Sequence, residues 1–172
     1  NGNRKIMDAF SFHPYPFPVD KAPDTPSDWP VVGMADLYRL KQAIWDAFNG
    51  TSQPTIEDGL KLDLDEVAYQ VSVSGKSNYT GAESIKSDDL VSEDQMATYY
   101  KALVAMAACD SSIESLNFFH FIDEASLSGF QSGFLDVNKA QRPVYDAVKS
   151  AIAATGGGST CTGTPVSWTH TT

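Results

Sequence analysis

The chain has 172 residues, of which 42% are hydrophobic and 20% are charged, a balance that predicts a folded domain rather than a disordered chain. Its net charge of −10 argues against a nucleic-acid partner, which requires a basic surface. No apolar run approaches the ~20 residues of a transmembrane helix, so we expect no membrane span. The chain starts at Asn1 without an initiator Met or a signal peptide, and we expect it to be a piece of a longer protein.

The first half of the sequence predicts two strands with one helix between them. Residues 5–12 are apolar enough for a buried strand, and the proline-rich loop that follows excludes a helix. Apolar residues recur at helical spacing over residues 34–48, and an Asn-Gly pair ends that helix. A second strand is predicted over residues 53–57, where a short β-prone stretch ends in a glutamate.

A long acidic connection, residues 58–94, follows the second predicted strand. Together with Glu57 it carries ten acidic residues and three lysines, a net charge of −7, which is typical of a solvated loop. Loops of this length usually cover a site or contain small elements of their own. Within it, Asp63, Asp65 and Glu66 resemble a calcium-binding run only loosely, and we assign them to the surface.

The second half predicts two more helices and a third strand. One helix runs to about residue 108, with Ser92 as its N-cap. The third strand covers residues 116–122, and the last helix covers residues 140–154. Three successive strand–helix pairs imply an α/β fold with parallel strands and crossover helices.

The end of the chain has a different composition. Residues 156–160 are a Gly/Ser/Thr linker, and residues 161–172 look like the first strand of a following β-domain or an extension that folds back. The two cysteines, Cys109 and Cys161, are too few and too far apart for a metal motif. In an exported protein they would form a disulfide, and otherwise they would be two separate thiols.

Four segments follow one another in an order known from one enzyme superfamily. They are residues 12–15 (Phe-His-Pro-Tyr), 54–59 (Pro-Thr-Ile-Glu-Asp-Gly), 118–124 with 129–134, and 142–148 (Arg-Pro-Val-Tyr-Asp-Ala-Val). Together they resemble strands six to eight and the final helix of a cellulase-like retaining glycoside hydrolase of the (β/α)8-barrel superfamily. None of the segments is specific alone, and their order carries the resemblance.

This resemblance implies a partial (β/α)8 TIM barrel in residues 1–155, with residues 156–172 as linker and start of a following β-domain. The implied activity is the hydrolysis of a β-linked polysaccharide or oligosaccharide with retention, in a secreted or cell-surface protein, without cofactor or metal. The implied partners are the carbohydrate substrate and the N-terminal half of the same barrel, whose fourth strand would carry the acid/base. We therefore expect this chain alone to be incomplete and inactive.

The resemblance assigns the nucleophile to Glu57, since active sites of barrels lie where strands end and a glycine turn follows this carboxylate. Without the resemblance, an exposed carboxylate at the start of a loop is the simpler interpretation. Tyr15 would donate a hydrogen bond that keeps Glu57 ionised, and His13 would do the same or bind a sugar hydroxyl. Alternatively, His13 and Tyr15 only stabilise the fold at the strand end. Glu124 ends the third predicted strand, but we expect it to hold loop backbone or an arginine.

Aromatic residues on the predicted loops are candidates for substrate binding, because sugars offer apolar C–H faces to aromatic rings. These candidates are Trp29, Tyr69, Phe121 and Phe130. They could equally pack their own loops. The Trp that often follows the eighth strand in the superfamily is not evident, and Phe121 or Phe130 would replace it. The alternatives to an enzyme are a non-catalytic carbohydrate-binding or surface-interaction protein with a degenerate barrel, and a half-barrel that pairs with its own copy.

Overall fold

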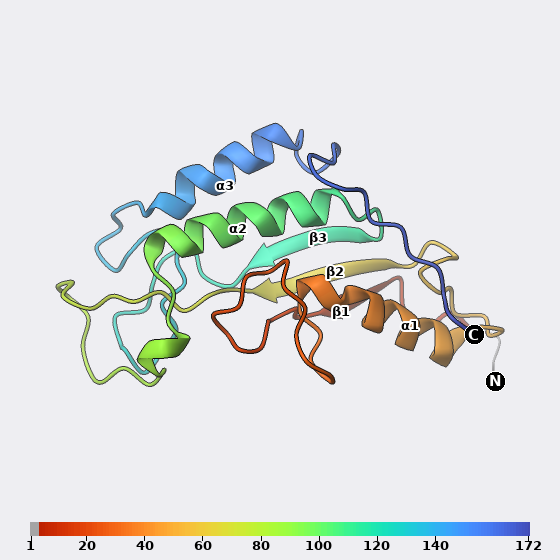
Figure 1. The fold of residues 1–172 in the computed structure, drawn as a ribbon, viewed down its shortest axis with the longest axis horizontal. Coiled ribbons are helices and arrows are strands. Elements are labelled where there is room, and N and C mark those ends of the chain that lie inside the picture. Colours follow the sequence, from red (N-terminus) through yellow and green to blue (C-terminus); the bar gives the residue numbers. More distant parts are fainter. Residues whose placement is uncertain (1–3) are drawn as a thin grey trace.

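The computed structural model describes residues 4–172, so the first three residues of the predicted barrel segment lie outside the described residues. Its centre is a three-stranded parallel sheet in the order β1-β2-β3. The strands are β1 (Ala9–Phe12), β2 (Lys61–Val67) and β3 (Ile113–Phe118). The helices are η1 (Met34–Asp36), α1 (Leu37–Phe48), η2 (Ser87–Asp89), α2 (Glu93–Ala108) and α3 (Pro143–Ala154). Helices alternate with the strands, α2 lies along β3, and α3 packs on α2 (Figure 1). The predicted α/β class with parallel strands and crossover helices is confirmed, and the sheet is not closed.

The second predicted strand, residues 53–57, is wrong. The chain turns there instead, because the Asp58 carboxylate accepts hydrogen bonds from the backbone N–H and the hydroxyl of Thr55. Gly59 follows with a φ of +95°, a left-handed conformation that suits glycine. Gln53 is buried, yet its side-chain oxygen binds the backbone N–H groups that precede β1 rather than a neighbouring strand.

The central strand β2 comes instead from the acidic run that the sequence analysis assigned to a surface loop. Leu62 and Leu64 are fully buried on the side of the helices. Asp63 and Asp65 lie on the opposite face, where each accepts a hydrogen bond from a serine of a neighbouring strand. The alternation of Leu and Asp is therefore the period-2 pattern of a strand with one buried and one polar face.

The other two strands are shorter or shifted relative to their predicted ranges. β1 begins at Ala9 because the backbone N–H groups of Ile6 and Met7 bind the side chain of Gln53. β3 ends at Phe118, although the apolar run continues to residue 122. The residues after Phe118 serve the next loop, where the carbonyl of Phe121 accepts a hydrogen bond from the backbone of Leu135.

The three predicted helices are confirmed, with ends that differ by a few residues. Ser92 caps α2 as predicted, and its hydroxyl accepts the backbone N–H of Gln95 while the Gln95 side chain accepts the N–H of Ser92. α3 starts at Pro143, in the first-turn position where a missing N–H costs nothing. Tyr100 of α2 is fully buried and stacks on Phe118 with ring centroids 4.4 Å apart, which joins helix and sheet in one core.

The C-terminal tail folds back along the body of the molecule toward the end of α1 (Figure 1). A disulfide joins Cys161 to Cys109 at the end of α2, which decides between the two alternatives for the cysteines. The His170 ring stacks on Trp45 of α1 at 4.0 Å. The start of a following β-domain in this segment stays a prediction. Within residues 4–172, none of the helices is long and apolar enough to cross a bilayer.

Candidate functional site

The candidate site lies at the C-terminal edge of the sheet, where parallel strands bring their loops together. His13 and Tyr15 follow β1, and Glu66 is the penultimate residue of the neighbouring strand β2. The Tyr15 hydroxyl donates a hydrogen bond to Oε1 of Glu66 over 2.9 Å. His13 Nδ1 is 3.9 Å from the same oxygen. Two predicted site residues therefore meet at one carboxylate, and that carboxylate belongs to Glu66.

An irregularity in β2 directs Glu66 to this position. Between Leu64 and Val67 the strand holds one residue more than the paired segment of β3 between Leu116 and Phe118. Such a bulge bends a strand and redirects the side chains around it, and bulges often lie beside active sites. With strict alternation, Glu66 would share the buried face of Leu64.

The environment of Glu66 favours a polar role. Its side chain is 31% exposed, and that of His13 is 51% exposed, so both are accessible from the mouth of the sheet. Burial raises the pKa of the Tyr15 phenol far above its ordinary value, and the hydrogen bond to Glu66 raises it further. Tyr15 thus stays protonated at physiological pH and is a permanent donor to Glu66. A carboxylate held in this way can act as a nucleophile or exchange a proton with a ligand.

Glu57 lies at the other end of the sheet. It is in the turn that precedes β2, whereas Tyr15 follows β1, and the two strands are parallel. The Glu57 carboxylate accepts the backbone N–H of His170 over 2.9 Å and contacts the ring Nδ1 at 3.0 Å. The backbone hydrogen bond, followed by the side-chain one, holds the pKa of Glu57 below its ordinary value. The structure therefore separates Glu57 from His13 and Tyr15 and makes it a partner of the tail.

The predicted aromatic contacts lie in four different settings. Tyr69 is 1% exposed, and its hydroxyl donates to the carbonyl of Lys21, so it belongs to the core. Trp29 is 78% exposed on the proline-rich loop. Phe121 is 59% exposed, and its ring lies 5.9 Å from that of Phe134 and 6.5 Å from that of Tyr145 in α3. The ring of Phe130 is 5.9 Å from that of Phe119, the residue directly after β3.

The arginine contact expected for Glu124 belongs instead to its neighbour Asp123. The guanidinium of Arg142 donates to both carboxylate oxygens of Asp123, over 2.8 and 2.6 Å, with both side chains fully buried. Arg142 also donates to the hydroxyl of Tyr79 and to Glu93. This network ties the loop after β2, the loop after β3 and the start of α2 together around the site.

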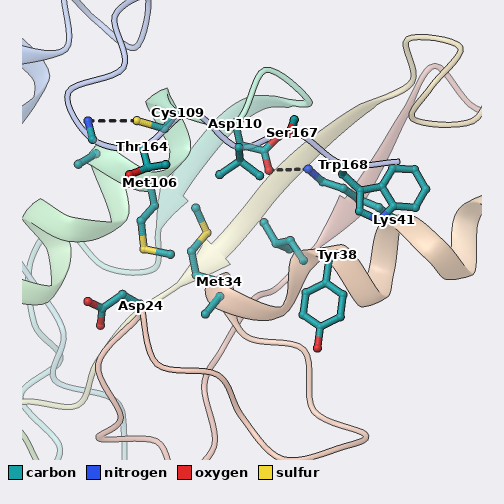
Figure 2. Close-up of a pocket in the computed structure, with 15 residues that line it drawn as sticks. Asp24, Met34, Tyr38, Lys41, Met106, Cys109, Asp110, Thr164, Ser167 and Trp168 are labelled. Carbon is teal, nitrogen blue, oxygen red and sulfur yellow. Dashed lines mark hydrogen bonds and ion pairs between the residues drawn. The ribbon is translucent and has the colours of Figure 1, made fainter. Parts of the chain in front are cut away.

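A second cavity has a volume of about 520 Å³, and Figure 2 shows the residues that line it. It opens between α1, the end of α2 and the tail, and Met34, Met106 and Trp168 line it. The buried ion pair between Lys41 and Asp110, 2.6 Å long, closes one side. Asp110 precedes β3, so this side of the cavity is at the N-terminal edge of the sheet, and Glu66 does not line the cavity.

Glu66 is the residue that the sequence analysis missed as a site. The signal was present, because Leu62, Leu64 and Val67 bracket the acids with the spacing of a strand that ends directly after Glu66. The high density of acidic residues hid it, since such a segment is typical of a solvated loop.

No protein-family model matches the sequence, and no curated protein matches it. Solved structures of glycoside hydrolases do match the fold. A GH2 β-galacturonidase from Eisenbergiella tayi superposes with a TM-score of 0.52 and 16% identity, over 95% of this chain and 25% of that chain. A family 39 glycoside hydrolase from Bacteroides cellulosilyticus WH2 superposes with a TM-score of 0.51 and 16% identity, over 84% of this chain and 26% of that chain.

The fold of this chain matches part of the barrels of these glycoside hydrolases. This chain spans about a quarter of the length of either matching protein. The likeness concerns the arrangement of parallel strands and helices, whose C-terminal edge is where (β/α)8 enzymes build their sites. That edge is the one that holds Tyr15 and Glu66 here.

Proposed function

We propose that this chain is part of a retaining glycoside hydrolase that cleaves β-linked polysaccharides or oligosaccharides, with Glu66 as the nucleophile. The observation that carries the proposal is the 2.9 Å hydrogen bond from Tyr15 to Glu66 across two neighbouring strand ends. Support for the reaction class comes from the likeness of the fold to glycoside hydrolases. Glu66 replaces Glu57 in this role because Glu57 lies at the wrong end of the sheet.

In the proposed reaction, a Glu66 carboxylate oxygen attacks the anomeric carbon while a carboxylic acid protonates the leaving oxygen. Water, deprotonated by the same acid/base group, then opens the resulting glycosyl ester and restores Glu66. Tyr15 holds the carboxylate in one orientation for both steps. His13 is half exposed beside it and is suited to bind a hydroxyl of the same sugar.

The acid/base belongs, in this proposal, to a strand in the N-terminal half of the same barrel. Retaining enzymes place their two carboxyl groups about 5–5.5 Å apart, on strands that a closed barrel brings together. The present sheet has three strands and a (β/α)8 barrel has eight, so we expect the chain alone to be inactive. The disulfide supports a secreted or cell-surface location, since such bonds persist in oxidising compartments.

The test compares the Glu66→Gln and Glu57→Gln variants of the full-length protein. Glutamine keeps the size of the side chain and removes the charge. We expect Glu66→Gln to lower kcat by about a thousandfold or more, as for the loss of a covalent nucleophile. Glu57→Gln should hydrolyse like the wild type. A slow 2-fluoro glycoside should label the peptide that contains Glu66, as detected by mass spectrometry. Normal hydrolysis by Glu66→Gln, or labelling of Glu57, would refute the assignment.

A non-catalytic carbohydrate-binding protein is the second candidate. It is favoured by the loop directly after β3, residues 119–134, which contains no Trp and begins with Phe119. Binding of a glycan by the wild-type full-length protein, without release of any product, would establish this alternative.

A further inference from the structure

A cavity of about 370 Å³ lies at the C-terminal end of β3 and has no role in the reaction described above. Phe119, His120, Glu124 and Phe130 surround it, together with part of the long loop after β2. The backbone N–H of Phe119 donates to the carbonyl of Val67 over 3.2 Å. The cavity therefore adjoins the strand end that carries Glu66.

The ring of Phe119 forms one wall of this cavity. Its position is fixed, because it stacks on His120 with centroids 4.0 Å apart and meets Phe130 edge-on. Nevertheless, Phe119 stays 37% exposed. A fixed and partly open aromatic ring is a suitable surface for the C–H face of a sugar ring.

Two polar side chains of the cavity, His120 and Glu124, offer hydrogen-bond acceptors. His120 Nδ1 is 2.8 Å from the carbonyl oxygen of Phe130, and a carbonyl only accepts, so Nδ1 carries the proton. In the neutral ring, Nε2 is then an acceptor. The exposed carboxylate of Glu124 forms no hydrogen bond or ion pair with any residue from 4 to 172. Sugar hydroxyls would donate hydrogen bonds to both acceptors, Nε2 of His120 and the carboxylate of Glu124.

Gly129 makes the position of Glu124 possible. A Cβ atom at residue 129 would lie 1.8 Å from Oε2 of Glu124, closer than a carbon and an oxygen that are not bonded can approach. A side chain at this position would therefore displace the carboxylate. The position of the Glu124 carboxylate in the wall of the cavity therefore depends on the glycine at residue 129.

The charge of the cavity restricts which sugars it can hold. Glu124 is negative, Glu66 lies at the adjacent strand end, and neither Lys nor Arg lines the cavity. Two like charges at contact distance repel each other, and a sugar carboxylate would meet no fixed cation here. We propose that this cavity is a subsite for an uncharged sugar unit and that Glu124 excludes uronic acids from it. This inference rests on the proposed glycosidase function and names its substrate class.

The experiment measures binding rather than hydrolysis, in the full-length protein that carries Glu66→Gln. The probes are cellotetraose and the β-1,4-linked tetramer of glucuronic acid, which differ only at C6. Titration calorimetry at low ionic strength should show the neutral probe bound at least about tenfold more tightly. Equal binding of the two probes, or binding of neither at millimolar concentration, would overturn the subsite.

Three variants locate the cause of the discrimination. Glu124→Gln should bring the affinity for the acidic probe to within about threefold of that for the neutral one, because the repelling charge is gone. Gly129→Ala should reduce the discrimination as well, although the charge is retained. The matched control is Glu114→Gln, which removes an exposed charge from the start of β3, and it should bind like the parent. If Glu114→Gln and Glu124→Gln act alike, net charge rather than Glu124 is responsible.

Failure of the subsite is distinguishable from failure of the proposed function. Products in the same titrated samples would show that Glu66 is not the nucleophile, whatever the affinities are. Conversely, equal affinities for the two probes with no products formed would refute the subsite and leave the proposed role of Glu66 standing.

Discussion

At the scale of single residues, the direction of the chain decides which carboxylate can act. Glu57 and Glu66 are close in sequence, yet Glu57 precedes β2 and Glu66 is its penultimate residue. The sequence predicts that the glycine turn after Glu57 follows the end of a strand. In the structure this turn precedes the start of β2. A turn signal marks a boundary without its direction, and only the Leu62–Leu64 alternation beyond it shows where the strand begins.

Replacement of Tyr15 by Phe tests whether this residue acts through Glu66. Hydrogen bonds to charged groups are worth about 1.5–3 kcal/mol, so Tyr15→Phe should lower kcat by roughly 10- to 100-fold in the full-length protein. Steady-state kinetics should show little change in KM.

The control for Tyr15→Phe is the same change in the Glu66→Gln background. If the phenol acts only on the carboxylate, the second substitution lowers the residual rate no further. Additive losses would instead show that Tyr15 supports the fold and not the carboxylate.

At the scale of elements, the loops around the site depend on one buried arginine. Arg142 is 3% exposed and binds Asp123, Tyr79 and Glu93, which come from three different segments. It lies just before α3, so the helix start and the loop positions are determined together. Sequence reasoning found the Arg-Pro start of this helix but had no means to pair Arg142 with Asp123, because that contact is set by tertiary packing.

We expect Arg142→Met to destabilise the full-length protein by about 3–5 kcal/mol, because it leaves the Asp123 carboxylate buried and unpaired. Urea denaturation followed by circular dichroism measures this loss. The double variant Arg142→Met/Asp123→Asn should be more stable than Arg142→Met alone, since it removes the buried charge. If the double variant is the less stable of the two, the pair contributes through packing and not through charge compensation.

At the scale of the whole molecule, the sequence pattern predicted the class and order of elements better than their boundaries. The helices followed from apolar spacing and caps, which are local signals. The boundaries of the strands did not follow from local signals. The residues before β1 bind the side chain of Gln53 instead of pairing with a strand, and β2 carries acidic residues on its polar face. Both effects arise from contacts between segments far apart in sequence. The same holds for the tail, whose His170 reaches Glu57 and Trp45 across the molecule.

The disulfide should determine whether the tail stays on the body. Cys109 and Cys161 are 52 residues apart, and closing a loop of that size typically contributes about 2–4 kcal/mol. In the paired variant Cys109→Ser/Cys161→Ser, we expect a lower melting temperature and faster amide exchange at Val166, whose N–H donates to the Cys109 carbonyl over 2.8 Å. Hydrolysis in the full-length protein should change little, because the tail attaches at the N-terminal edge and Glu66 lies at the other. Unchanged exchange at Val166 would show that the contacts of His170 hold the tail without the disulfide.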